Sequence, residues 1–481
     1  MKKSMLFMLI VVIAFALVAT FALSGCKATT TETTAATTTA ASGTTAIAET
    51  TAAETTAAET TSGEPVKLLF YWWGEQEFPG MEQWMAKTVD LYHQQNPNIT
   101  VEPVLQNADT VYTAYRAAAE AGEGPDIGFM WGGIYLFEDV WKGNVEPMDK
   151  YFSEDDLKDI IALDANVFEG KLYGIPWTNG FYVWNYNKTL FKQAGLDPEN
   201  FPKTWEDFMS ACKALNSSGV TPIGFGTTDG YEAIAFADSI LKEFINYHYE
   251  ILEPVVGKDS YTSDKYVKFF NYIKEISPYV NDDALSLDYY KGVDLFPQGK
   301  VAMGTSTNGL VASWIRDETM TVDELGLSAG PKIEAGSVFT GTMPLLPYVW
   351  VLTPWSKNKQ EAANFIKFMN TEDRLNDLYK TCGTMPSNKK FDANLLSNEI
   401  EKKLFDYNLN QAEIEVAQAF LPTQIQFEGF AKPFESVLNG SITPEEAVKM
   451  LEETSKKWGT ENPEMLIQYT KWYEDMKSRN Y

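Results

Sequence analysis

Residues 66–130 begin with Val66-Lys67-Leu68-Leu69-Phe70-Tyr71-Trp72, a short run rich in aliphatic and aromatic side chains. Similar runs follow at residues 99–105 and 126–130. Between them lie two segments whose apolar residues recur at helical spacing. The first is ended by Pro97, and the second has Asp109 as its expected N-cap. This order of strand, helix, strand, helix and strand predicts a mostly parallel sheet covered by helices.

The same alternation resumes further along the chain. Strands are predicted at residues 172–176, 181–186, 221–225, 300–304 and 348–352. Helices are predicted at residues 205–215 and 359–369 and after Thr443. Two of these helices begin with a capping box, Thr204-Trp205-Glu206-Asp207 and Thr443-Pro444-Glu445-Glu446. The pattern predicts two α/β units and contains no internal repeat.

The N-terminus has the pattern of an export signal. Lys2 and Lys3 precede an uncharged, mostly apolar run that ends in Leu23-Ser24-Gly25-Cys26, which resembles the bacterial lipobox. We therefore expect a lipoprotein signal peptide at 1–25 and a lipid on Cys26, at the outer face of the cytoplasmic membrane. The alternative is a transmembrane anchor, since the run is long enough to span a bilayer. The Thr/Ala/Glu-rich residues that follow predict a disordered tether over 26–64.

Charge and composition exclude several classes of function. The formal net charge of −27 disfavours nucleic acid and anionic membrane surfaces as partners. The chain has only two histidines, His93 and His248, so a histidine-based triad or zinc site is not expected. No phosphate-binding loop is present, and no cofactor or metal is expected. Cys212 and Cys382 lack metal-ligand spacing and are expected to be separate thiols rather than a bridge.

Several short motifs follow one another in a fixed order along the chain. They are Gly124-Pro125-Asp126-Ile127, Phe168-Glu169-Gly170-Lys171-Leu172-Tyr173-Gly174-Ile175-Pro176-Trp177, Tyr186-Asn187-Lys188-Thr189-Leu190-Phe191, Ala194-Gly195-Leu196, Pro202-Lys203-Thr204-Trp205, Phe296-Pro297-Gln298-Gly299-Lys300-Val301, Glu361-Ala362-Ala363 and Leu438-Asn439-Gly440. Their shared order and spacing resembles the extracellular solute-binding proteins of family 1, the carbohydrate receptors of ABC importers, which include maltose-binding proteins. The resemblance covers essentially all of residues 65–481.

The resemblance implies a two-lobed α/β fold of the periplasmic-binding-protein type, with a ligand cleft between the lobes. It places the N-terminal lobe at 65–177 and 343–382 and the C-terminal lobe at 178–342 and 383–481. The chain would cross between lobes near 177–180, 342–347 and 382–386. The implied protein is a monomeric, non-catalytic receptor that binds a neutral mono- or oligosaccharide and passes it to an ABC permease.

The candidate ligand-binding residues combine aromatic rings with carboxylates and amides. Such a set suits a sugar, because rings cover its C–H faces while polar groups meet its hydroxyls. By resemblance, the candidates are Trp73, Glu75, Gln76, Trp131, Trp177, Asn179, Asp229, Tyr231, Asn308, Trp350 and Glu428. Maltose binders have a Glu where this chain has Gly180, which argues against maltose itself.

Three other functions remain open at this point. A glycosidase needs only two carboxylates, which a chain with 66 acidic residues can supply. A receptor of the same fold could bind a non-sugar solute. An iron site built on Tyr289-Tyr290 is the specific case, although packing is the favoured explanation for that pair. A surface glycan-binding adhesin needs no importer.

Overall fold

The computed structural model describes residues 64–108, 110–333, 337–414 and 417–479. The predicted signal peptide, Cys26, nearly all of the tether and the Asp109 cap lie outside these residues. Within them, no helix is both long and apolar enough to cross a membrane. Cys212 and Cys382 are buried and unbridged, which confirms the expectation of two separate thiols.

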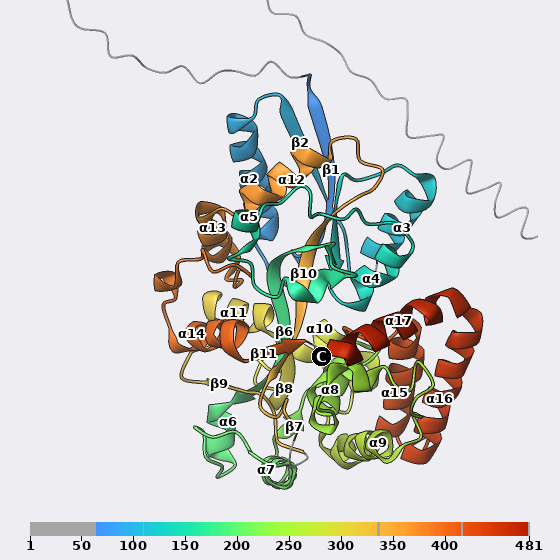
Figure 1. The fold of residues 1–481 in the computed structure, drawn as a ribbon. Helices are drawn as coiled ribbons and strands as arrows, with labels where there is room; N and C mark the ends of the chain where they lie inside the picture. The colour runs from blue at the N-terminus through green and yellow to red at the C-terminus, as the bar shows by residue number, and fades with distance from the viewer. Residues whose placement is uncertain (1–63, 109, 334–336, 415–416, 480–481) are drawn as a thin grey trace, which may run out of the picture. The chain divides into compact units, whose positions relative to one another are not determined.

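The core of the fold is a nine-stranded sheet with the order β2-β1-β3-β10-β6-β8-β7, in which β11 also pairs with β10 and β9 with β6 (Figure 1). The strands are β1 (Val66–Trp72), β2 (Ile99–Leu105), β3 (Ile127–Trp131), β6 (Ile175–Asn187), β7 (Thr221–Ile223), β8 (Val301–Thr307), β9 (Leu325–Ser328), β10 (Met343–Leu352) and β11 (Ala412–Ile414). A separate pair is formed by β4 (Val167–Phe168) and β5 (Lys171–Leu172).

Two parallel groups of strands meet on antiparallel partners. β1 runs parallel to β2 and β3, and β7 runs parallel to β8. Between the groups, β10 is antiparallel to β3 and β6, and β6 is antiparallel to β8. The predicted parallel sheet is thus correct for each group, whereas the strands that join the groups are antiparallel.

Helices cover both groups of strands (Figure 1). Around β1–β3 and in the chain after β10 lie α2 (Met81–Gln95), α3 (Val111–Ala121), α4 (Ile134–Trp141), α5 (Glu154–Leu157), α12 (Lys359–Met369) and α13 (Glu372–Cys382). The remaining helices are α6 (Lys188–Gln193), α7 (Trp205–Ser217), α8 (Tyr231–Leu241), α9 (Asp264–Ile276), α10 (Tyr289–Val293), α11 (Asn308–Arg316), α14 (Glu399–Asp406), α15 (Lys432–Leu438), α16 (Pro444–Glu461) and α17 (Pro463–Arg479), with a π-helical segment η8 (Ile425–Ala431).

The local signals in the sequence account for the helix starts. Thr204 caps α7 by accepting a hydrogen bond from the Asp207 backbone N–H, and Thr443 forms a full capping box with Glu446 at α16. The helix predicted at 359–369 coincides with α12, in which Ala362, Phe365, Ile366 and Met369 form one buried face. Amphipathic spacing therefore located these helices correctly.

The segment 172–187 differs from its prediction. Instead of two strands at 172–176 and 181–186, the chain forms the short β5 and then one continuous strand, β6, in which all thirteen residues are buried. The strand stays continuous because its backbone has partners along its whole length. Ile175–Phe181 pair with β10, and Tyr182–Asn187 pair with β8 and β9.

The three segments predicted to cross between lobes lie side by side. β10 pairs with the first half of β6, and Pro386 forms an isolated antiparallel bridge to Thr178 of β6. The Thr178 hydroxyl also donates to the Met385 carbonyl oxygen at 2.7 Å. This adjacency is what a hinge between two lobes requires, but the lobe boundaries themselves stay a prediction.

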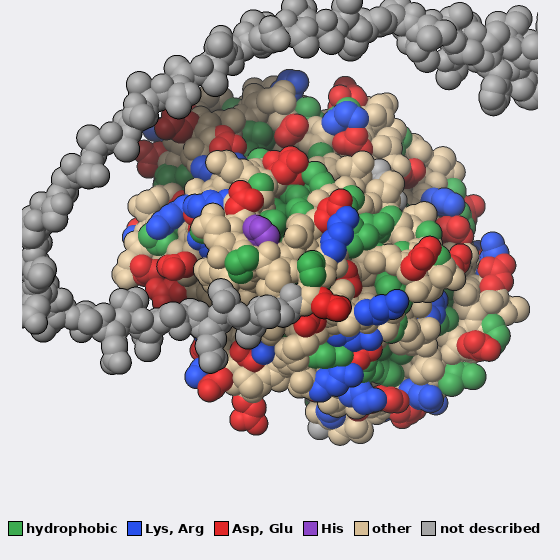
Figure 2. Space-filling view, turned by 90° about the horizontal axis from the view of Figure 1, so that it is seen from above, with side chains coloured by type: hydrophobic (Ala, Val, Ile, Leu, Met, Phe, Trp, Pro, Cys, Tyr) green, Lys and Arg blue, Asp and Glu red, His purple; other side chains and the backbone are tan. Residues whose placement is uncertain are grey.

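Charged side chains are mixed on the face shown in Figure 2. Lys and Arg side chains lie among Asp and Glu side chains there. Several ion pairs in the described part of the chain join exposed residues close in sequence, as in Lys402–Glu399 and Arg479–Asp475. Exposed pairs of this kind contribute little to stability.

Candidate ligand-binding site

A cavity rich in aromatic residues lies where the parallel strands end. Trp73 and Glu77 follow β1, Trp131 ends β3, and Thr307 ends β8. The described residues that line it are Trp73, Glu77, Ala108, Trp131, Tyr182, Tyr231, Tyr289, Tyr290, Thr307, Tyr348 and Gln418. We call this the aromatic cavity. The carboxyl ends of strands are where open α/β sheets hold their ligands.

One wall of the aromatic cavity comes from β1, β3 and β10. The ring centroids of Trp73 and Trp131 lie 5.1 Å apart, and the Tyr348 ring meets Trp73 nearly edge-on at 5.7 Å. Behind them, Tyr112 of α3 stacks on Trp131 at 5.7 Å, and its hydroxyl accepts the Trp131 backbone N–H at 3.0 Å. The two indoles are therefore held by rigid neighbours on several sides.

The opposite wall is built from tyrosines. Tyr182 of β6 and Tyr289 of α10 meet edge to face at 6.2 Å, and Tyr290 lies 5.4 Å from Tyr289. The Asp229 carboxylate accepts the backbone N–H of Tyr289 at 3.1 Å and that of Tyr231 at 3.3 Å. Asp229 thus positions two of the lining rings without lining the cavity itself.

Glu77 is the one carboxyl group among the described lining residues. Its side chain is 3% exposed, and the Tyr348 hydroxyl donates to its two oxygens at 3.2 and 3.1 Å. Burial raises the pKa of Glu77 from 4.5 to about 7, and the hydroxyls of Thr307 and Tyr348 oppose this increase only in part. The group is therefore poised between its neutral and charged forms near neutral pH.

The surroundings of the aromatic cavity are acidic. Glu232 of α8 is fully buried, and its pKa is raised well above normal by burial and by nearby Asp229. Its charge and that of Glu77 both act on Tyr289 and help to raise the pKa of that phenol. Among the described lining residues there is no Lys, Arg or His.

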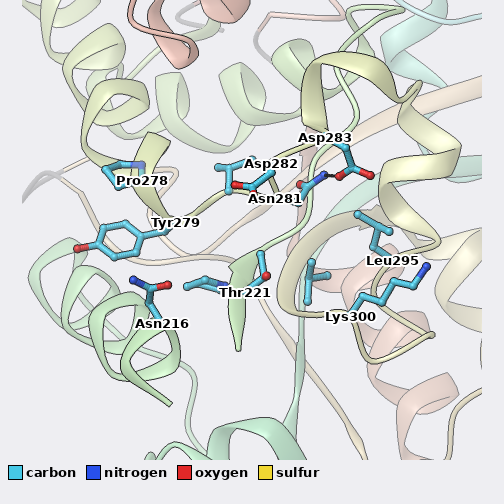
Figure 3. Close-up of a pocket in the computed structure, with 12 residues that line it drawn as sticks. Asn216, Thr221, Pro278, Tyr279, Asn281, Asp282, Asp283, Leu295 and Lys300 are labelled. Atoms are coloured by element: carbon cyan, nitrogen blue, oxygen red, sulfur yellow. Dashed lines mark hydrogen bonds between the residues drawn. The ribbon is translucent and has the colours of Figure 1, made fainter. Parts of the chain in front are cut away.

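A larger hollow lies at the other end of β7 and β8 (Figure 3). Its volume is about 430 Å³, and Tyr279, Asp282 and Lys300 are among its lining residues. The Asn281 side chain already has hydrogen-bond partners. Its oxygen accepts the Phe225 backbone N–H, and its NH₂ group donates to the Phe225 carbonyl oxygen and, at 2.7 Å, to Asp283. Thr221 and Val301 are the first residues of their strands, so this hollow faces the amino ends of the sheet. We therefore place the candidate site in the aromatic cavity.

Comparison with known proteins is consistent with this arrangement. A family profile described as bacterial extracellular solute-binding protein matches residues 87–404. The chain belongs to this family. A binding protein of Brucella abortus is 26% identical over 69% of this chain and 76% of its own length. An uncharacterized ABC transporter extracellular-binding protein of Pyrococcus horikoshii is 21% identical over 79% of this chain and 84% of its own.

Solved structures establish the fold of this solute-binding protein. A structure titled chitin oligosaccharide binding protein superposes with a TM-score of 0.73 at 21% identity, covering 82% of this chain and 99% of that chain. The fold is thus the α/β periplasmic-binding-protein-like fold that the resemblance implied. Family membership also confirms the prediction of a non-enzymatic receptor. No group of three His, Cys, Asp or Glu side chains suited to a metal occurs among the described residues.

The solute-binding protein brings three of the predicted site residues together at the aromatic cavity: Trp73, Trp131 and Tyr231. Asp229 lies directly behind it. Glu75 and Gln76, the candidates in the loop after β1, do not line the cavity. Glu75 accepts the backbone N–H groups of Gly80 and Glu82 at the start of α2, and Gln76 is exposed.

The other candidates have structural contacts. Trp177 and Trp350 stack on each other at 5.1 Å in the core. Asn308 accepts the Phe181 N–H at 3.0 Å and donates to the Asn179 carbonyl oxygen at 3.1 Å, and so ties α11 to β6. Glu428 of η8 accepts a hydrogen bond from the side chain of Gln424, the residue before η8. None of these five lines the aromatic cavity.

Several lining residues were missed, and two of them have a clear structural origin. After β1 the chain forms a turn in which the backbone N–H groups of Glu77 and Phe78 donate to the Gly74 carbonyl oxygen. This turn places the side chain of Glu77, rather than that of Glu75, at the cavity. Tyr348 lies two residues before Trp350 and therefore on the same face of β10, opposite Trp131. Gly180 leaves room for it, since a Cβ there would come within 2.3 Å of the Tyr348 hydroxyl oxygen. Tyr289 and Tyr290, which the sequence suggested were packing residues, line the cavity as well.

Glu77 should give the protein a measurable pH dependence of stability. The unfolded chain loses this proton near pH 4.5, whereas the folded protein keeps it until about pH 7. Its stabilising contribution is therefore fully present below pH 4.5 and is lost as the pH rises to about 7. At about 1.4 kcal/mol per pKa unit, the loss is about 3 kcal/mol.

The measurement is the free energy of unfolding from urea titrations between pH 4.5 and 7.5. Over this range, the free energy of unfolding of a Glu77→Gln variant should fall by about 3 kcal/mol less than that of the wild type. A Thr307→Val variant lacks a hydroxyl that lowers the pKa, so its loss should extend to higher pH. Parallel pH profiles for the wild type and Glu77→Gln would contradict the assignment.

Proposed function

We propose that this protein captures a mono- or oligosaccharide in the aromatic cavity and delivers it to an ABC permease. The observation that carries the proposal is the composition of the cavity, seven aromatic rings around one buried carboxyl group at the carboxyl ends of the strands. The relative from Pyrococcus horikoshii is named as part of an ABC transporter, and the structural neighbour is named for a chitin oligosaccharide.

The lining residues match the two kinds of surface that a sugar presents. The ring faces of Trp73, Trp131 and the tyrosines suit the C–H faces of a pyranose. Glu77, Thr307 and Gln418 can exchange hydrogen bonds with its hydroxyls. The Trp73 indole N–H is buried and has no acceptor among the described residues, so a ligand oxygen can satisfy it.

The size of the aromatic cavity supports a binding mode that involves opening and closing. Its free volume is about 40 Å³, which is enough for water but too small for a pyranose ring. The ligand therefore has to enter while the two walls are further apart. A hinge at β6, β10 and residues 382–386, with lobes divided as the sequence predicted, provides this motion.

A glycosidase is the less favoured alternative. Glycoside hydrolysis uses two carboxyl groups flanking the scissile bond. Only Glu77 supplies one among the described lining residues of the aromatic cavity, while Glu232 and Asp229 lie behind the tyrosines. Family membership points the same way. A receptor for a non-sugar solute is a second alternative, and the binding assay described below tests it as well.

We also propose that the protein is held at the outer face of the cytoplasmic membrane by a lipid on Cys26. The Leu23-Ser24-Gly25-Cys26 sequence after an apolar run supports this proposal. The Thr/Ala/Glu-rich residues up to 64 would then act as a flexible tether, with a mean reach of about 35 Å. Such a tether lets the receptor close on its solute and still meet a permease in the same membrane.

Sugar binding should stabilise the protein and change its tryptophan emission. Ligand that binds only the native state raises the melting temperature, and Trp73 and Trp131 lie at the cavity wall. A panel of monosaccharides and oligosaccharides is screened by both signals. If no sugar moves either signal while an amino acid or metal ion does, the sugar assignment is wrong.

The same sugar should bind about tenfold more weakly to a Tyr290→Ala variant, because one ring face of the site is removed. Tyr247→Ala is the matched control, since Tyr247 is 39% exposed and stacks on Tyr249 outside the aromatic cavity. Equal affinities for the two variants would argue against this cavity as the binding site.

Replacing Cys26 by Ala should release the protein from the membrane fraction or leave its signal uncleaved, while sugar affinity stays unchanged. Fractionation of expressing cells with metabolic labelling by a radioactive fatty acid provides the measurement. A variant that still carries label and remains in the membrane fraction would exclude lipidation at this position.

A further inference from the structure

The charge around the aromatic cavity is one-sided. Glu77 lines it, and Glu232 and Asp229 lie directly behind its tyrosine wall. Among the described residues, Glu77 makes no ion pair with a Lys, Arg or His side chain, and none of these residue types lines the cavity. A buried carboxylate that lacks a cation is costly, because desolvation disfavours its charged form.

The nearby basic residues are already paired away from the aromatic cavity. Arg116, which lies over the ring of Tyr112 behind Trp131, is bound by Glu138 and Asp139. Lys291, next to Tyr290 in the chain, is exposed and pairs with Asp288. Neither side chain therefore balances the charge of Glu77. A positive charge beside Glu77 would have to come from the ligand.

We propose that the ligand of the aromatic cavity is a sugar that carries an ammonium group, an amino sugar or an oligomer that contains one, with Glu77 as the residue that selects it. This inference rests on the proposed sugar-binding function and deepens it. The ammonium group donates charge-assisted hydrogen bonds to the Glu77 carboxylate, and these are stronger than hydrogen bonds from a neutral hydroxyl.

The aromatic walls favour the same ligand. A cation over the face of a Trp or Tyr ring is attracted by the negative charge of the π face, and this attraction increases when water is excluded. The described lining offers two tryptophans and five tyrosines. A neutral sugar uses these rings only as apolar surface, and an anionic solute would meet the Glu77 carboxyl group with no basic residue among the described lining.

The geometry also explains how Glu77 remains tolerable in the empty protein. Tyr348 donates to both of its oxygens, and burial favours the protonated form near neutral pH. Binding of an ammonium group supplies the missing countercharge and allows the charged carboxylate to persist in the closed cavity. Asp229, which holds Tyr231 and Tyr289 through their backbone N–H groups, keeps the tyrosine wall in place.

Isothermal titration of the wild-type protein with matched sugar sets tests the inference. Each set contains a 2-amino-2-deoxyhexose of gluco, galacto or manno configuration, its N-acetyl derivative and the parent hexose, as monosaccharides and as short oligomers. In the set that binds, the ammonium-bearing member should bind at least tenfold more tightly than both neutral members of the same length. Equal or tighter binding of the neutral members would overturn the inference while the proposed sugar receptor stands.

A Glu77→Gln variant tests the assigned residue. The amide has the same shape but cannot carry the negative charge that balances an ammonium group, so the ratio of the affinity for the ammonium member to that for the neutral members of its set should fall from at least tenfold to about one. Retention of the preference in this variant would overturn the role of Glu77. If no member of any set binds the wild type while another sugar of the wider panel does, the inference is wrong and the proposed sugar receptor stands.

Discussion

The arrangement of the site depends on the pairing of one long strand. β6 pairs with β10 through its first half and with β8 and β9 through its second half. Trp131, at the carboxyl end of β3, pairs with Tyr348 of β10, which in turn pairs with Thr178 in the middle of β6. Thr307, at the carboxyl end of β8, pairs with Tyr182, also in the middle of β6. Because β1 and β7 run parallel to β3 and β8, all four strands direct their carboxyl ends toward the same point.

This convergence has a chemical consequence. Side chains from distant parts of the sequence are collected into one small cavity, in which Glu77 is the one carboxyl group among aromatic rings of the described lining. Low polarity makes every electrostatic interaction there stronger than at the surface. Under the proposed function, the carboxyl group would distinguish one solute from another, whereas the rings would contribute affinity to many sugars.

The sequence was informative wherever local pattern determines structure. The strands at 66–72 and 99–105 and the helix at 359–369 were predicted with their observed bounds, because the periodicity of their apolar residues is contained within each segment. The continuity of β6 was not predictable in the same way. Its residues 177–180 are held in the strand by β10, which lies more than 160 residues later.

Prediction of the site was limited by the same distinction. Trp73, Trp131 and Tyr231 were found because strand ends and aromatic residues are visible in sequence. Glu77 was missed in favour of Glu75, since the turn at Gly74 determines which side chain faces the cavity. Trp350 lies on the correct face of β10, but it pairs with Phe129 in the core, whereas Tyr348 pairs with Trp131 at the cavity. The local sequence does not encode this register against β3.

The central claim is that the solute binds at the point where these strand ends converge. A crystal structure of the protein with its bound sugar tests this claim most directly. The account predicts a sugar ring in contact with Trp73 or Trp131 and within hydrogen-bond distance of Glu77, between walls that have closed on it. A sugar bound in the hollow lined by Tyr279 and Asp282, or anywhere out of reach of Glu77, would contradict it.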